Sequence, residues 1–169
     1  MSEIRFTVHG VPAPQGSKRA FVRAGHAVMQ ESSGDRLVSW RQDVKAAALA
    51  VRPPEPIAGP VDVRVVFLFA RPKGHYRTGR HADRIRPSAP EWPANRGTGD
   101  LDHLIRATFD PITAARVWLD DSQVIRVTAT KQYTHRGGPL GALIWITPLT
   151  PPPGPLGEDG PEGDESETP

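Results

Sequence analysis

The sequence predicts a single-domain α+β protein, with one mixed β-sheet and two helices packed on one face of it. Two observations support this fold class. Several segments alternate apolar and polar residues or form short apolar runs, and two longer segments carry apolar residues at helical spacing. The predicted order is strand, hairpin, helix, strand, helix, strand, strand, and 169 residues are enough for one domain with a modest core.

The strand predictions rest on alternation and on apolar runs. Residues 4–8 alternate, and residues 61–69 alternate at first and then stay apolar, which is typical of a central strand. Residues 124–131 and 142–146 supply the strands that close the sheet. A short hairpin is expected over residues 21–29, because two apolar runs flank Ala24-Gly25-His26.

The first helix is predicted over residues 33–51. Ser32 or Ser33 would cap it, and Pro53-Pro54 would end it. Trp40 lies on its apolar stripe, so it is expected to be a core anchor rather than a platform for stacking a base. The stripe consists of Leu37, Trp40, Val44, Ala47, Ala48 and Val51.

The second helix is predicted to begin after Asp100, an N-cap residue that follows Gly97, Thr98 and Gly99. It is expected to end near Asp110, because Pro111 disfavours the α conformation of the residue before it. Its apolar stripe is Leu101, Leu104, Ile105, Thr108 and Ile112.

Acidic residues mark the start of this helix and the start of the strand that follows. Asp102 lies in the first helical turn, four residues before Arg106, and Asp120 and Asp121 precede the strand over residues 124–131. These carboxylates are expected to converge and to form an oxygen-rich site that suits Mg²⁺, with Mn²⁺ as the alternative ion. The alternative is ordinary capping and turn chemistry.

Composition and charge narrow the class of protein. The chain has no cysteine, no apolar run near the ~20 residues of a membrane span and no signal-peptide pattern, so a soluble, cytoplasmic protein is expected. Residues 1–149 hold 21 basic and 13 acidic residues, a balance of +8, and are expected to form the folded domain. Residues 150–169, rich in Pro, Gly and acids, are expected to be a disordered tail. A basic body suggests a polyanionic partner, although many soluble domains are simply basic.

A long segment without periodicity, residues 71–99, is expected to bind nucleic acid. Its cations can neutralise phosphates, and Tyr76 and Trp92 can stack on unpaired bases. A solvated linker is the alternative. Lys18 and Arg19, in a basic loop over residues 10–23, are further candidates for contact with a phosphate backbone, with a plain surface turn as the alternative. The cations of the long segment are Arg71, Lys73, Arg77, Arg80, Arg84, Arg86 and Arg96.

Two motifs carry a resemblance to a known family. Asp100-Leu101-Asp102-His103-Leu104-Ile105-Arg106, followed by Trp118-Leu119-Asp120-Asp121-Ser122-Gln123-Val124, resembles the signature of the RusA family of small Mg²⁺-dependent Holliday-junction resolvases, typical of phages and prophages. The resemblance implies a homodimer that cuts branched DNA in the nucleoid of a bacterial or phage-infected cell. It implies Asp100, Asp102 and Asp121 as metal ligands and catalytic acids, with Asp120 beside them.

The chain departs from the family pattern at two positions. His103 stands where the family usually has Asn, and Arg106 stands where it usually has a catalytic Lys. Arg106 cannot act as a general base, because its guanidinium stays protonated, so its expected role is to stabilise charge on the scissile phosphate. His103 is expected either to hydrogen-bond a ligand or phosphate, or to be a surface residue. These two departures leave a second interpretation open, in which the chain is a relative that binds branched DNA without cutting it.

Overall fold

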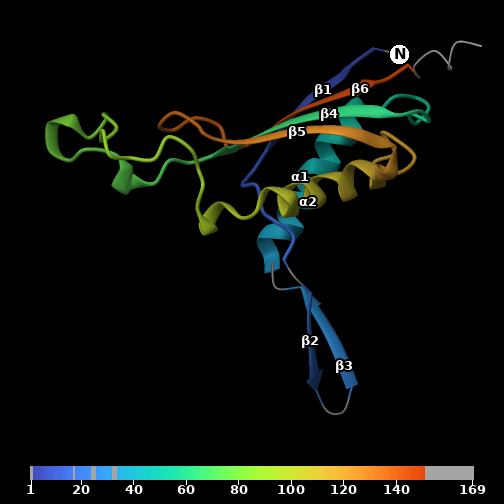
Figure 1. Cartoon of the computed structure of the whole chain (residues 1–169), viewed down its shortest axis with the longest axis horizontal. Coiled ribbons are helices and arrows are strands. Elements are labelled where there is room, and N and C mark those ends of the chain that lie inside the picture. The colour runs from blue at the N-terminus through green and yellow to red at the C-terminus, as the bar shows by residue number, and fades with distance from the viewer. Residues whose placement is uncertain (1, 17, 24–25, 32–33, 151–169) are drawn as a thin grey trace, which may run out of the picture.

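The computed structural model describes residues 2–16, 18–23, 26–31 and 34–150. A four-stranded mixed sheet has the order β1-β6-β4-β5, and two helices cover one of its faces (Figure 1). β4 pairs antiparallel with β6 and parallel with β5. The predicted fold class is therefore confirmed. The elements of this layer pair are β1 (Ile4–His9), α1 (Gly34–Val51), β4 (Val61–Phe69), α2 (Leu101–Ala114), β5 (Val124–Tyr133) and β6 (Gly141–Pro148).

The core lies between the sheet and the two helices. Every second residue of β4 from Val61 to Phe69 is buried, and β4 has a neighbour on each side, so the prediction of a central strand is confirmed. Trp40 is fully buried, and its ring lies 6.5 Å from that of Phe67. Its Nε1 donates to Thr108 Oγ1 on α2 at 3.3 Å, which joins the helices inside the core. Trp40 is thus the core anchor that its spacing predicted.

Helix α2 extends beyond the predicted end at Asp110, and that prediction is wrong. Pro111 lies inside the helix, which continues to Ala114. An interior proline costs about 3 kcal/mol. Burial of Ile112 offsets roughly 1.5–3 kcal/mol of that cost. Burial of Trp118, just beyond the helix, offsets more of it. Asp110 is exposed and pairs with Arg41 of α1 at 2.9 Å.

Strands β2 (Lys18–Arg23) and β3 (His26–Glu31) form the predicted hairpin as a separate two-stranded sheet, which projects from the rest of the fold (Figure 1). β2 already begins at Lys18, so Lys18 and Arg19 belong to a strand and not to a loop. Cross-strand pairing gives these residues partners that no short-range pattern revealed. The capping serines predicted for α1 and the predicted tail after residue 150 lie outside the described residues.

Residues 71–99, here called the arm, leave the sheet at the end of β4 and return at the start of α2 (Figure 1). The arm contains three short 3₁₀ turns, at Lys73–His75, Gly79–His81 and Arg96–Thr98, and a bridge between Tyr76 and Ile85. In the described part of the chain, no helix is long and apolar enough to cross a membrane.

Candidate metal centre and basic arm

The start of α2 presents an acidic cluster. Asp100 occupies the N-cap position, with φ −80° and ψ 144°, but its side chain makes no capping hydrogen bond. The Asp100 carboxylate is therefore not engaged in capping the helix, which was the alternative role for it. Ligand atoms of Asp100, Asp102 and His103 all lie within 4.8 Å of one another. The structure thus brings together the two predicted ligands of α2 and adds His103.

The donor set of this cluster fits a divalent cation. Two carboxylates and an imidazole supply oxygen and nitrogen ligands, and the side chain of Asp102 is 80% exposed, which leaves coordination positions open to water or phosphate. His103 Nε2 lies 3.7 Å from Asp102 Oδ2. A nitrogen ligand suits Mn²⁺ and later transition metals better than it suits Mg²⁺.

Asp120 and Asp121 lie at the other end of α2. Trp118, just before them, donates its Nε1 to Thr113 Oγ1 near the helix C-terminus at 2.6 Å, whereas Lys131, near the end of β5, reaches Gly99 at the helix N-terminus. Helix α2 has 14 residues and is about 20 Å long. The sequence predicted that Asp120 and Asp121 would meet the acids at the start of α2. Within one chain they lie apart from those acids (Figure 1). Spacing along the sequence could not reveal that β5 runs back along α2.

The Asp120 carboxylate caps a short 3₁₀ turn, Asp121–Gln123. Its Oδ1 accepts from the backbone N–H of Ser122 at 2.9 Å, and Gln123 Oε1 accepts from the backbone N–H of Asp120 in return. Hydrogen bonds from the Ser122 side chain and backbone lower the pKa of Asp120 below its ordinary value of 3.8. The Asp120 carboxylate is thus engaged in capping this turn. Asp121 is exposed, and its carboxylate takes no part in the cap.

Lys131 holds the backbone that leads into the acidic cluster, a contribution that the sequence did not reveal. Its Nζ donates to the Gly99 carbonyl at 2.8 Å and to Thr98 Oγ1 at 3.4 Å. On the other side, the Gln15 backbone N–H donates to the His103 carbonyl at 3.1 Å. The only signal in the sequence was a lysine near the end of a predicted strand, which by itself indicates an ordinary surface residue.

Arg106 is exposed on α2, one turn beyond the cluster. Among the described residues, it makes no ion pair with Asp102, the partner that their spacing suggested. Its guanidinium is therefore available to a ligand that approaches the start of α2.

The cations of the arm fall into two groups. Arg71 and Arg86 use their guanidiniums to hold the arm together, through bonds to the Pro90 carbonyl at 2.7 Å and the Tyr76 carbonyl at 2.8 Å. Arg80 contacts the His81 ring at 3.2 Å. In the described part of the chain, the exposed side chains of the remaining cations make no hydrogen bond or ion pair. These are Lys73, Arg77, Arg84 and Arg96.

Fold and site together define a class of protein: a small α+β domain that presents a cluster able to hold a divalent cation, next to a basic arm. Comparison with known proteins then places the chain in a family. Residues 9–140 match the family model for endodeoxyribonuclease RusA, and the chain belongs to this family. Members of this family are metal-dependent endodeoxyribonucleases, and the family implies a DNA substrate.

Individual relatives match over different lengths. An uncharacterized protein of Bacillus subtilis strain 168, YqaN, is 27% identical over 140 residues, which is 80% of this chain and 91% of YqaN. The crossover junction endodeoxyribonucleases of Enterobacteria phage 82 and Escherichia coli strain K12 are each 44% identical over 50 residues. That match covers 30% of this chain and 42% of each enzyme.

Proposed function

We propose that this protein is a metal-dependent endonuclease that hydrolyses phosphodiester bonds in branched DNA, with Holliday junctions as the reference substrate. The observation that carries the proposal is the cluster of Asp100, Asp102 and His103, whose ligand atoms lie within 4.8 Å of one another at the start of α2 in a chain of the RusA family. A protein that only binds DNA gains nothing from exposed carboxylates facing phosphate.

Each residue of the site has a proposed role. Asp100, Asp102 and His103 would hold Mg²⁺ or Mn²⁺, and a bound ion supplies the positive charge that polarises a phosphate and makes water more nucleophilic. Arg106 donates hydrogen bonds to the scissile phosphate, because a guanidinium stays charged and offers a fork of donors. The unpaired cations of the arm bind the phosphates of the flanking strands.

We propose that the active form is a homodimer, in which a second copy supplies Asp121 to the ion. Within one chain Asp121 lies about 20 Å along α2 from Asp100, so it cannot share an ion with that residue. β5 is an edge strand whose Ile125 and Val127 are 66% and 40% exposed. Exposed apolar residues on a sheet edge offer a surface that a second copy would cover.

Incubation of the protein with a labelled four-way junction tests the proposal. Cleavage should require Mg²⁺ or Mn²⁺, and Asp102→Asn should abolish it while junction binding stays equal or becomes tighter, because a negative charge is removed. The matched control is Asp35→Asn, an exposed acid in the first turn of α1, which should leave cleavage unchanged. Full cleavage by Asp102→Asn would remove the metal assignment.

Mixing two inactive variants tests the shared site. A heterodimer of Asp102→Asn and Asp121→Asn keeps one site with all its ligands if each site draws on both chains, so cleavage of one strand should return on mixing. If each site belongs to one chain, the mixture stays inactive. Sedimentation at micromolar concentration reports the oligomeric state independently.

A second candidate function is branched-DNA binding without cleavage, and it is motivated by Arg106 and His103, where the chain departs from the family pattern. It predicts a wild-type protein that binds junctions and never cuts them with either metal. Arg106→Lys combined with His103→Asn would then restore cleavage.

A further inference from the structure

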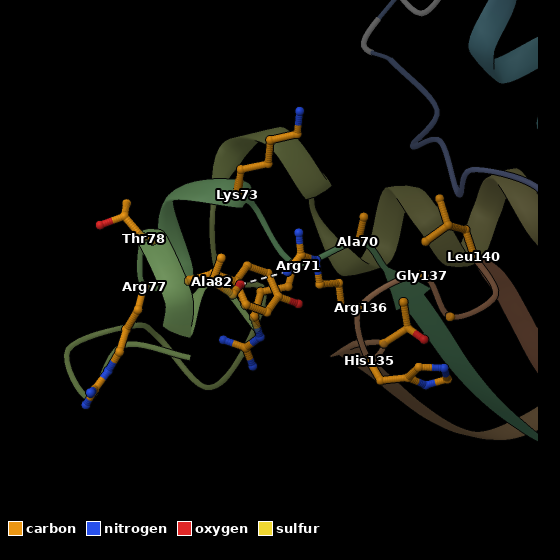
Figure 2. Close-up of a pocket in the computed structure, with 14 residues that line it drawn as sticks. Ala70, Arg71, Lys73, Arg77, Thr78, Ala82, His135, Arg136, Gly137 and Leu140 are labelled. Atoms are coloured by element: carbon orange, nitrogen blue, oxygen red, sulfur yellow. Dashed lines mark hydrogen bonds between the residues drawn. The ribbon is translucent and has the colours of Figure 1, made fainter. Parts of the chain in front are cut away.

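A cationic cavity of about 620 Å³ lies between the arm and the turn that joins β5 to β6, residues 134–140. Figure 2 shows Lys73, Arg77 and Thr78 of the arm on one side and His135, Arg136 and Gly137 of the turn on the other. Four cations line it, and no acidic residue does; the cations are Arg71, Lys73, Arg77 and Arg136. The volume falls within the range of sites that hold small organic ligands, about 300–1,000 Å³.

Specific contacts hold the two walls of this cavity in place. Arg136 Nη1 donates to the Ala82 carbonyl at 2.8 Å, which fixes the turn to the arm, and the same guanidinium lies 5.5 Å from the centre of the Tyr76 ring. Arg71 lies 4.5 Å from the centre of the Tyr133 ring at the end of β5. A ligand would therefore enter a cavity whose walls are already joined, which lowers the entropy cost of binding.

The charges of the cavity select an anion. Lys73 and Arg77 make no side-chain hydrogen bond or ion pair within the described residues, so both are available to a ligand. A phosphate group satisfies such donors, because its oxygens accept several hydrogen bonds and its charge offsets theirs.

The cavity also offers a surface for a planar group. Tyr76 is half-buried in its wall, with the Arg136 guanidinium beside its ring. Nucleobases stack on aromatic rings and on guanidinium planes whatever their sequence. Inorganic phosphate alone would leave this surface unused.

We propose that this cavity binds one unpaired nucleotide of a DNA strand, with its phosphate on Lys73 and Arg77 and its base against Tyr76 and Arg136. This inference rests on the proposed function, since it assigns a part of the same DNA substrate to a second place on the protein. The arm joins the two places, because its last residue, Gly99, precedes Asp100. One unpaired nucleotide of a strand opened at a branch point would thus be held in the cavity, while the phosphate to be cut lies at the acidic cluster.

Binding without metal tests this site separately from cleavage. The probe is a fluorescein-labelled dT₁₂, compared with an abasic 12-mer of equal charge, by anisotropy in EDTA with the full chain. Wild type should bind dT₁₂ about ten-fold more tightly than the abasic strand, because stacking contributes only with dT₁₂. Tyr76→Leu should remove that preference, and Tyr76→Phe should keep it. Equal binding of the two probes by wild type would overturn the proposal.

A charge-matched pair of variants tests the phosphate contacts. Lys73→Gln with Arg77→Gln should weaken dT₁₂ binding about ten-fold or more, whereas Lys45→Gln with Arg52→Gln, exposed cations of α1 and its end, should weaken it much less. Equal losses would mean that the cations act only through net charge, and the site would be wrong. The side chains of Lys73 and Arg77 make no hydrogen bond or ion pair within the described residues, so their replacement should not unfold the protein. This comparison therefore stays informative if Tyr76→Leu does not fold.

Two further outcomes separate the alternatives. Thymidine monophosphate should compete with dT₁₂ only at millimolar concentration; micromolar competition would indicate a site for free nucleotides and would overturn the assignment to a DNA strand. Cleavage of junctions by a protein that fails the dT₁₂ tests would leave the proposed function standing and remove the cavity site. A protein that passes the dT₁₂ tests but never cuts junctions would support the cavity site and contradict the proposed function.

Discussion

Replacing Gly99 with alanine perturbs the backbone immediately before the acidic cluster. Gly99 has φ 73° and ψ 173°, a conformation that is essentially restricted to glycine and costs other residues about 1–3 kcal/mol. A Cβ at this position would lie 2.5 Å from Pro14 Cγ, and overpacking of this kind costs about 1–3 kcal/mol more. We therefore predict that Gly99→Ala lowers the free energy of unfolding by about 3 kcal/mol, which shifts Tm by roughly 6–12 °C.

Urea unfolding followed by tryptophan fluorescence measures this loss, because Trp40 and Trp118 are fully buried. Gly137→Ala is the matched control: its φ is 74°, but its Cβ would meet no atom within 4 Å, so it should cost only about 1–2 kcal/mol. Pro14→Gly in the Gly99→Ala background should recover part of the difference in a double-mutant cycle. Gly99→Ala should also weaken Mn²⁺ binding, since Asp100 moves with the backbone. Equal losses in the two alanine variants, with no recovery, would refute the role of the Pro14 contact.

Three further predictions concern the site and the charge of the chain. Arg106→Ala should lower the junction cleavage rate by about 10²–10³ with little change in affinity, and Arg106→Lys should retain activity; a wild-type rate for Arg106→Ala would leave this residue as helix surface. His103→Asn should weaken Mn²⁺ binding more than Mg²⁺ binding in calorimetric titrations, because it replaces a nitrogen ligand with an amide oxygen; equal changes would argue against a ligand role for His103. Deleting residues 157–169, which removes six acids, should tighten DNA binding at low salt, and this gain should fade as salt rises; unchanged affinity at low salt would contradict it.

Local patterns in the sequence determined most of the secondary structure. Alternation identified β1 and the central strand β4, and helical spacing placed Trp40 in the core. The signals for Asp100 were also local: breakers before it, an apolar stripe after it, and Asp102 in the next turn. Each of these depends on residues within a few positions of one another, where backbone geometry fixes the periods of strand and helix.

Tertiary structure decided which residues of the site meet. α2 continues through Pro111 because Ile112 and the residues beyond it find a buried place between helix and sheet, which no local preference predicts. The direction of β5 relative to α2 separates Asp121 from Asp100, brings Lys131 to Gly99 and places Arg136 against Tyr76. These relations join residues tens of positions apart. They follow from the pairing of β5 with β4 and the packing of α2, which arise only when the whole core is assembled.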